Sequence, residues 1–232
     1  MNRFFVLILV AVWSVFAVDA QTTFSKNLKA GKKQTVVFYG TSAAINPSNR
    51  FWVEQLQGKL DKQFPGKVDF YNCSKSGIGS FWATENFKDS VLMCYCDVFN
   101  PDLLIFGFSE NDAVLRFNNW PWYSGRCAEY MIDHLREQNQ DATIILYIIS
   151  ERPLGKAAET RPEIAAFNAS CREIAKKKDI ILTDFSVTFN EIYEKFGEEG
   201  LKQYQRDGIL PTKKAANEVL VPMLWEAIFG KK

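Results

Sequence analysis

Histidine is almost missing from this sequence, because His134 is the only one among its 232 residues. The scarcity matters, since histidine is the most frequent general base of enzymes and the commonest metal ligand. Cys94-Tyr95-Cys96 is too closely spaced for a recognised zinc motif, and no histidine lies near it. We therefore expect no metal site, and no motif in the sequence calls for a cofactor.

A large net charge of either sign is also missing. The sequence has 28 Lys and Arg residues and 27 Asp and Glu residues, which gives a net charge of +1. Such a chain lacks the basic surface that nucleic-acid-binding domains present to phosphates, and we expect no nucleic-acid partner. Beyond residue 20 no apolar run approaches the roughly 20 residues of a membrane-spanning helix. Stable membrane insertion is therefore not expected, and the sequence leaves the oligomeric state unknown.

The one long apolar run lies at the N-terminus. Arg3 is followed by the almost wholly apolar stretch Phe4–Val18, and small residues suited to cleavage follow up to Ala20. This is the pattern of a secretory signal peptide. We predict a signal peptide over residues 1–20, cleavage near Ala20, and a secreted or periplasmic protein. An uncleaved N-terminal anchor is the alternative.

All five cysteines follow the predicted cleavage point, at Cys73, Cys94, Cys96, Cys127 and Cys171. An odd number in an exported protein leaves one thiol unpaired, or paired with another chain. The count is compatible with one or two disulfides, and the spacing does not give their connectivity.

Short runs rich in Val, Ile, Leu and Phe alternate with helical patterns along residues 21–232. The predicted strands are Gln34–Tyr39, Val68–Asn72, Leu103–Gly107, Thr143–Ile149 and Ile180–Thr183. The predicted helices are Arg50–Phe64, Phe81–Met93, Gly125–Asn139, Arg161–Lys177, Val187–Phe196 and Thr212–Phe229. Strands this apolar are typical of parallel sheets buried on both faces. The alternation predicts an α/β fold, a single-domain three-layer α/β/α sandwich around a five-stranded parallel sheet.

Polar and glycine-containing segments follow the predicted strands, at the edge of the sheet where ligand sites collect. Ser42 follows the first strand in a Gly-Thr-Ser turn, where its hydroxyl is exposed and its backbone N–H can face a developing oxyanion. Gly77 follows the second strand and offers another backbone N–H. Asn111 follows the third strand in a Ser-Glu-Asn-Asp segment, and Asp207 precedes the last helix.

In this order and placement, the four residues resemble the landmarks of the SGNH, or GDSL-type, hydrolase family of lipases and esterases. The resemblance implies a flavodoxin-like sheet and assigns Ser42 as the nucleophile. It assigns the backbone N–H groups of Ser42 and Gly77 and the side-chain amide of Asn111 to the oxyanion hole, and Asp207 to the orientation of a histidine. It also implies a small ester or an acylated carbohydrate as substrate.

Three residues depart from the family pattern. Thr41 stands in place of the usual aspartate before the serine, and Ser109 stands in place of a glycine; both changes are mild. Leu210 stands three residues after Asp207, where the family has its catalytic histidine. A serine hydroxyl is a poor nucleophile until a base takes its proton, and leucine has no basic atom.

Loss of the histidine from a comparable triad lowers kcat by a factor on the order of 10⁶. We therefore expect a serine esterase whose catalysis is impaired. The alternative is a non-catalytic pseudoenzyme that binds a glycan or a protein. Substitute bases are few: His134 is predicted to face solvent, and Lys213 and Lys214 would need strongly depressed pKa values. Asp207 acting directly on Ser42 would be a weak base unless it is desolvated.

Three tryptophans follow the glycine and asparagine segments, at Trp82, Trp120 and Trp122. Aromatic rings present broad apolar faces against which the apolar faces of sugars can pack. We therefore predict that these tryptophans bind carbohydrate at the rim of the site. The alternative is that they cover hydrophobic surface beneath a loop.

Overall fold

The computed structural model describes residues 21–45, 48, 50–88 and 100–230. The predicted signal peptide, Cys94 and Cys96 lie outside these ranges, as does the end of the helix predicted over Phe81–Met93. Within the described ranges, no helix combines the length and the apolar character needed to cross a bilayer.

Five parallel strands form the central sheet, in the order β2-β1-β3-β4-β5. Their bounds are β1 Gln34–Tyr39, β2 Val68–Asn72, β3 Leu103–Phe106, β4 Thr143–Ile148 and β5 Ile181–Asp184. The predicted α/β fold with a five-stranded parallel sheet is therefore confirmed. The order reverses between β1 and β3, which makes their carboxyl ends the topological switch point of the sheet.

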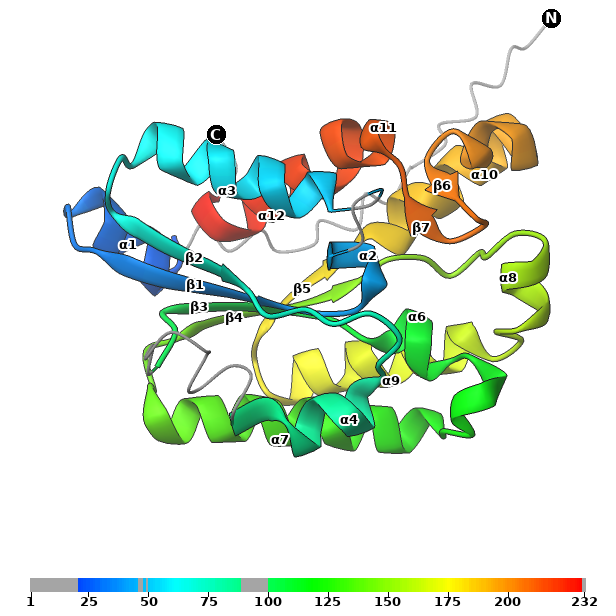
Figure 1. The fold of residues 1–232 in the computed structure, drawn as a ribbon, viewed down its shortest axis with the longest axis horizontal. Helices are drawn as coiled ribbons and strands as arrows, with labels where there is room; N and C mark the ends of the chain where they lie inside the picture. Colours follow the sequence, from blue (N-terminus) through cyan, green and yellow to red (C-terminus); the bar gives the residue numbers. More distant parts are fainter. Residues whose placement is uncertain (1–20, 46–47, 49, 89–99, 231–232) are drawn as a thin grey trace, which may run out of the picture.

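Helices cover both faces of the sheet, as Figure 1 shows. One face carries α1 (Thr23–Lys29), α3 (Phe51–Gln63), α10 (Phe185–Lys202) and α12 (Val221–Phe229). The other face carries α4 (Ser80–Glu85), α7 (Pro121–Gln138) and α9 (Ile164–Lys177). Each face holds its own cluster of buried apolar side chains, so that the sheet is the middle layer of three.

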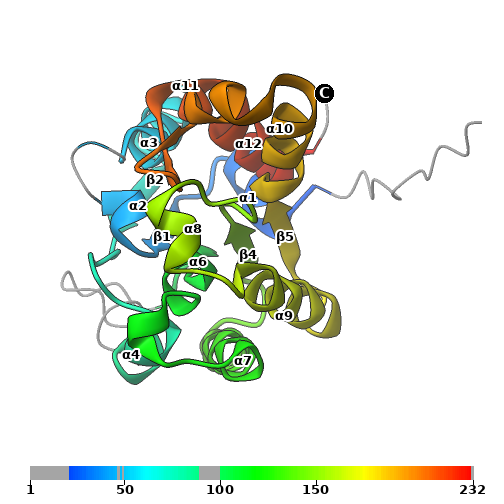
Figure 2. The ribbon, with the colours of Figure 1, turned by 90° about the vertical axis from the view of Figure 1, so that its right-hand side faces the viewer.

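Short elements gather at the carboxyl ends of the strands, toward the viewer in Figure 2. They are α2 (Ser42–Ile45), α6 (Ser109–Asp112), the 3₁₀ turn η2 (Leu115–Phe117), α8 (Lys156–Glu159), and the two-stranded ribbon of β6 (Gln205–Arg206) and β7 (Leu210–Pro211). After the ribbon come α11 (Lys213–Ala215) and the π turn η3 (Ala216–Leu220), which leads into α12. The helix predicted over Thr212–Phe229 is therefore divided into three parts.

Two helices begin earlier than their apolar patterns predict. The helix predicted over Gly125–Asn139 begins at Pro121, where proline is favoured because the first helical N–H needs no partner. The helix predicted over Val187–Phe196 begins at Phe185, because the Asp184 side chain accepts a hydrogen bond from the Ser186 N–H.

Trp52 ties α2 to the core. Its ring is fully buried and packs edge-on against Phe38 and Tyr147, with centroid distances of 4.9 and 5.2 Å. Its indole N–H donates to the Ala43 carbonyl at 2.8 Å. Burial of a side chain of this size stabilises the fold by roughly 2–3 kcal/mol, and the hydrogen bond fixes the position of the residue next to Ser42.

Candidate active site

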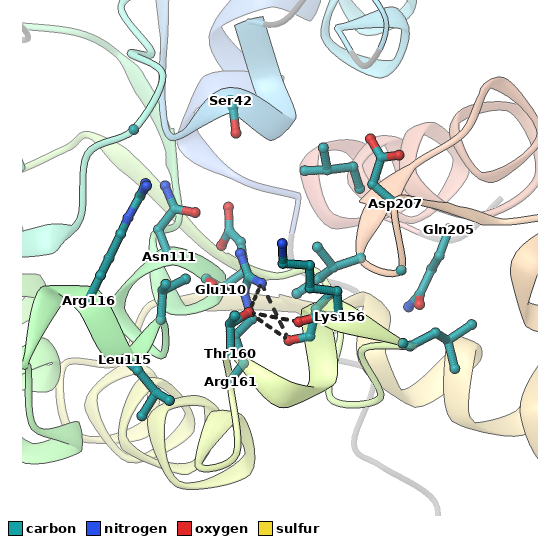
Figure 3. Close-up of a pocket in the computed structure, with 18 of the residues that line it drawn as sticks. Ser42, Glu110, Asn111, Leu115, Arg116, Lys156, Thr160, Arg161, Gln205 and Asp207 are labelled. Atoms are coloured by element: carbon teal, nitrogen blue, oxygen red, sulfur yellow. Dashed lines mark hydrogen bonds between the residues drawn. The ribbon is translucent and has the colours of Figure 1, made fainter.

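Ser42 begins α2 directly after the tight turn that ends β1. The turn requires glycine at position 40, because a Cβ there would lie 2.1 Å from the Tyr147 hydroxyl oxygen. The Ser42 hydroxyl points into a cavity, and none of the cavity residues drawn in Figure 3 makes a hydrogen bond to it. The Ser42 hydroxyl therefore faces the cavity and donates no hydrogen bond to these residues.

Thr41, which departs from the family pattern, connects the serine turn to α6. Its side chain is fully buried, and its hydroxyl donates to Glu110 Oε1 at 2.5 Å. Burial raises the pKa of the Glu110 carboxyl from 4.5 to about 7, against the hydrogen bond from Thr41, which lowers it. A carboxyl group that is partly protonated near neutral pH therefore lies beneath the serine turn.

The expected oxyanion donors lie on the neighbouring loops. Gly77 has a φ of +75°, a conformation that favours glycine. Asn111 is buried on α6, and its Nδ2 donates to the Ile78 carbonyl at 2.7 Å. Because an amide nitrogen carries two hydrogens, this bond orients Asn111 and leaves one N–H for a ligand.

Asp112 holds the Gly77 loop against α6 and α7. Its carboxylate accepts hydrogen bonds from the Ser80 N–H at 2.7 Å and from the Ser124 hydroxyl. A Cβ at Gly79 would lie 2.5 Å from Asp112 Oδ1, so only glycine allows this close approach. The carboxylate is fully buried, and burial raises its pKa.

Asp207 lies on the turn between β6 and β7, and Leu210 is the first residue of β7. Asp207 has a φ of +52°, its side chain is 69% exposed, and its Oδ2 is 3.3 Å from Arg206 Nε. The carbonyl of Gly208 accepts a hydrogen bond from the Leu154 N–H at 2.8 Å, which fixes the turn against the loop before α8. Leu210 is partly buried and packs against two apolar clusters.

One cavity of about 1150 Å³ brings these residues together (Figure 3). Ser42, Gly77 and Asn111 line it together with Asp207 and Leu210. The predicted site residues therefore share one cavity, and the catalytic and oxyanion roles assigned to them stay predictions. At the wall where the family pattern has a histidine, the cavity presents the apolar side chain of Leu210.

Comparison with known proteins shows the family of the chain. The model of the GDSL-like lipase/acylhydrolase family matches residues 37–215. The chain belongs to this family. No curated protein matches it in sequence.

Solved structures of lipases and esterases share the fold. A putative GDSL-like lipase from Parabacteroides merdae is 18% identical, with a TM-score of 0.68, 85% of this chain and 96% of that chain covered. The lipase/acylhydrolase from Enterococcus faecalis is 16% identical, with a TM-score of 0.67 and coverage of 84% and 95%. A catalytic mutant of an acetylxylan esterase from Geobacillus stearothermophilus is 14% identical, with a TM-score of 0.68 and coverage of 85% and 95%.

Of the substitute bases named from the sequence, Asp207 lines the cavity, whereas His134, Lys213 and Lys214 do not. His134 lies on α7 and is partly buried rather than simply solvent-facing, with its ring stacked on Tyr130 at a centroid distance of 3.9 Å. Lys214 pairs with Glu218 at 2.9 Å, and this pairing raises the lysine pKa, whereas a catalytic base needs a depressed one. Lys213 is exposed on α11.

Sequence reasoning missed the charged residues that line the cavity besides Asp207, namely Glu110, Arg116, Lys156, Arg161, Glu198 and Lys202. Arg116 on η2 and Lys156 on α8 are both exposed, and Figure 3 shows their charged ends directed into the cavity. Glu110 was recognised only as part of the asparagine segment. No local pattern reveals Glu110, Arg116 and Lys156, because tertiary packing brings their short helical elements to the cavity.

Two of the three predicted tryptophans border a second, smaller cavity of about 380 Å³, and Trp122 does not line it. Gly77 lines both cavities, so the smaller one adjoins the serine site. Trp82 and Trp120 line the smaller cavity, and Lys75 Nζ lies 4.2 Å from the centroid of the Trp82 ring. Trp122 is 62% exposed and stacks on Trp120, which is 58% exposed, at a centroid distance of 6.1 Å.

Proposed function

We propose that this GDSL-family protein binds a small ester or an acylated carbohydrate in the Ser42 cavity and hydrolyses it slowly, because the base is missing. The observation that carries the proposal is the pairing of Ser42 with Leu210 on the walls of one cavity. Ser42, Gly77 and Asn111 suit an acyl group, whereas Leu210 offers no atom that can accept a proton.

The residues present account for one half of ester hydrolysis. The carbonyl oxygen of the ester fits among the backbone N–H groups of Ser42 and Gly77 and the free N–H of Asn111. Donors aimed at a developing oxyanion contribute about 2.7–4 kcal/mol each to transition-state stabilisation. The other half, removal of the Ser42 proton and its delivery to the leaving alcohol, lacks the histidine that performs it in the family pattern, because Leu210 stands at that position.

A carbohydrate ligand follows from the second cavity. The exposed faces of Trp120 and Phe81 border it, and it meets the serine site at Gly77. A sugar packed against these rings would place its acyl group beside Ser42. The acetylxylan esterase that shares the fold is named for such a substrate.

Labelling with a fluorophosphonate tests the state of the serine. We expect the wild-type protein to label slowly and Ser42→Ala to show no labelling. Hydrolysis of p-nitrophenyl acetate by the wild-type protein should be close to background, because the expected deficit is on the order of 10⁶ in kcat.

Leu210→His supplies the missing base three residues after Asp207. We expect it to raise Ser42-dependent hydrolysis at least about 100-fold, within the range that general acid–base catalysis provides. Leu210→Asn is the matched control, because it adds a polar side chain without a base of suitable pKa. Fast Ser42-dependent turnover by the wild-type protein, left unchanged by Leu210→His, would contradict the proposal.

The second candidate is a non-catalytic protein that binds glycan or a protein partner through the same surface. The exposure of the stacked pair Trp120 and Trp122 favours it, because large exposed aromatic surfaces mark binding sites. A wild-type protein that neither labels nor hydrolyses esters, yet binds xylotriose and loses this binding in Trp120→Ala, would select this candidate. Phe196→Ala, which removes an exposed aromatic ring on α10, is the control.

We also propose that the protein is exported through its N-terminal segment. Sequencing of the protein recovered from cell envelopes or culture medium should find Gln21 as the first residue. Residues 1–20 retained on the recovered protein would instead favour the uncleaved anchor.

A further inference from the structure

Arg116 and Lys156 give the Ser42 cavity two cationic groups that the family mechanism does not use. They come from different walls, Arg116 from η2 and Lys156 from α8. In Figure 3 the charged ends of Arg116 and Lys156 are directed into the cavity that Asn111 and Asp207 also line. Neither cation forms an ion pair with a residue in the described part of the chain.

The acidic residues of the cavity do not neutralise these two cations. Glu198 pairs with Lys202 at 3.0 Å, and the Asp207 carboxylate lies next to Arg206. Glu110 is buried, and its burial favours the neutral form. The solvent-accessible part of the cavity therefore has an excess of positive charge, which attracts anionic ligands.

Two further residues of the cavity lining can donate hydrogen bonds. Asn111 keeps one amide N–H beyond its bond to the Ile78 carbonyl, and Gly77 carries a backbone N–H. An arginine fork pairs with a planar carboxylate through two parallel hydrogen bonds, and lysine adds a point charge. The arrangement suits a carboxylate at the side of the cavity between the two cations, with an acyl group extending to Ser42.

We infer that the ligand is an anionic carbohydrate, an acylated sugar whose carboxylate is held between Arg116 and Lys156, as in a uronic acid. The inference rests on the proposed function, because it specifies the sugar that the Ser42 cavity binds. Arg116 and Lys156 are then specificity-determining residues, and the aromatic cavity next to Gly77 holds the neighbouring sugar unit.

Calorimetric titration of the mature protein tests this inference with two trisaccharides, trigalacturonate and the neutral galactotriose. We expect trigalacturonate to bind at least about 10-fold more tightly in 50 mM NaCl. The difference should shrink in 500 mM NaCl, because salt screens exposed charges. Glucose 6-sulfate compared with glucuronate then distinguishes a sulfated sugar from a carboxylate.

Arg116→Gln and Lys156→Gln should each weaken trigalacturonate binding about 5-fold and leave galactotriose binding unchanged. Lys213→Gln is the matched control, since Lys213 is an exposed lysine outside the cavity lining. If Arg116→Gln fails to fold, Lys156→Gln alone tests whether the cations bind the carboxylate. Lys156 is exposed and has no side-chain partner in the described ranges, so its replacement should not disturb folding.

The outcomes separate this inference from the proposed function. Equal affinity for the two trisaccharides would overturn the anionic ligand while the carbohydrate proposal stands. Preference for glucose 6-sulfate over glucuronate would overturn the carboxylate. Failure of every sugar to bind, together with an unlabelled Ser42, would overturn both the inference and the proposed function.

Discussion

Replacing Glu110 with glutamine should flatten a fall in stability that the wild-type protein shows between about pH 4.5 and pH 7. Burial raises the pKa of the Glu110 carboxyl from 4.5 to about 7. Between these two values the folded protein keeps a proton that the unfolded chain has already released. Stability therefore decreases as the pH rises through this window. The contribution is fully present below pH 4.5 and is lost once the pH passes about 7.

The size of the effect follows from the shift. At 1.36 kcal/mol per pKa unit, the change from 4.5 to about 7 corresponds to about 3 kcal/mol of unfolding free energy. For a protein of this length, 1 kcal/mol moves Tm by about 2–4 °C. Glu110 alone should therefore lower Tm by about 6–12 °C between pH 4.5 and pH 7.5.

Urea unfolding at pH 5.0, 6.0 and 7.5 measures the effect in three proteins: the wild type, Glu110→Gln, and the control Glu159→Gln. Burial also raises the pKa of Asp112, whose contribution has the same sign, but Asp112 is common to all three proteins. The difference in slope between the wild type and Glu110→Gln therefore isolates Glu110.

The unfolding free energy of Glu110→Gln at one pH is less informative than the slope of that free energy against pH. Glu110 Oε2 is buried without a hydrogen-bond partner, so an amide N–H there would remain unsatisfied at about 1–3 kcal/mol. Glu159 is exposed on α8, and its replacement should leave the slope unchanged. Equal slopes for the wild type and Glu110→Gln would refute the argument that a neutral acid is buried under the serine turn.

Three further substitutions test the packing of the site by thermal unfolding. Gly40→Ala should destabilise the protein by about 1–3 kcal/mol, because the new Cβ would lie 2.1 Å from the Tyr147 hydroxyl. Gly58→Ala should stabilise it by about 0.5–1 kcal/mol, because this glycine is in α3 with nothing within 4 Å of a Cβ; a loss would contradict this reasoning. Asp112→Ala should cost at least about 1–3 kcal/mol, because the Ser124 hydroxyl loses its buried acceptor.

The strands could be predicted because each buried strand is a short run of apolar residues in the sequence. β1 and β2 have the predicted bounds, and the other three strands differ from prediction by one residue at an end or at both ends. Helix ends were predicted less well, since they depend on single contacts. The cap at Asp184 is a side-chain hydrogen bond, and no apolar periodicity reports it.

The site was predictable only where the order of strands decides proximity. Ser42 and Asn111 follow β1 and β3, which are neighbours in the sheet, so their convergence follows from the topology. Glu110, Arg116 and Lys156 could not be placed in this way. In the sequence Glu110 reads as an ordinary helical carboxylate, and its burial arises from contact with Thr41, 69 residues away along the chain.

Leu210 contributes to packing as well as leaving the site without a base, and this sets a limit on Leu210→His. The side chain is partly buried and packs against two apolar clusters. Exchanging it for a polar imidazole removes apolar burial, and we expect a loss of about 1–2 kcal/mol. The loss should appear as a Tm lower by about 2–8 °C. Leu210→Met keeps the volume and apolar character and should lose less.

A Leu210→His protein as stable as the wild type would show that the leucine is held there by neither packing nor burial. If the expected loss is found, stability and catalysis make opposite demands on this one position, as is common at active sites. Hydrolysis by Leu210→His must then be measured well below its lowered Tm. Otherwise an unfolded fraction would be mistaken for a serine that the new histidine fails to activate.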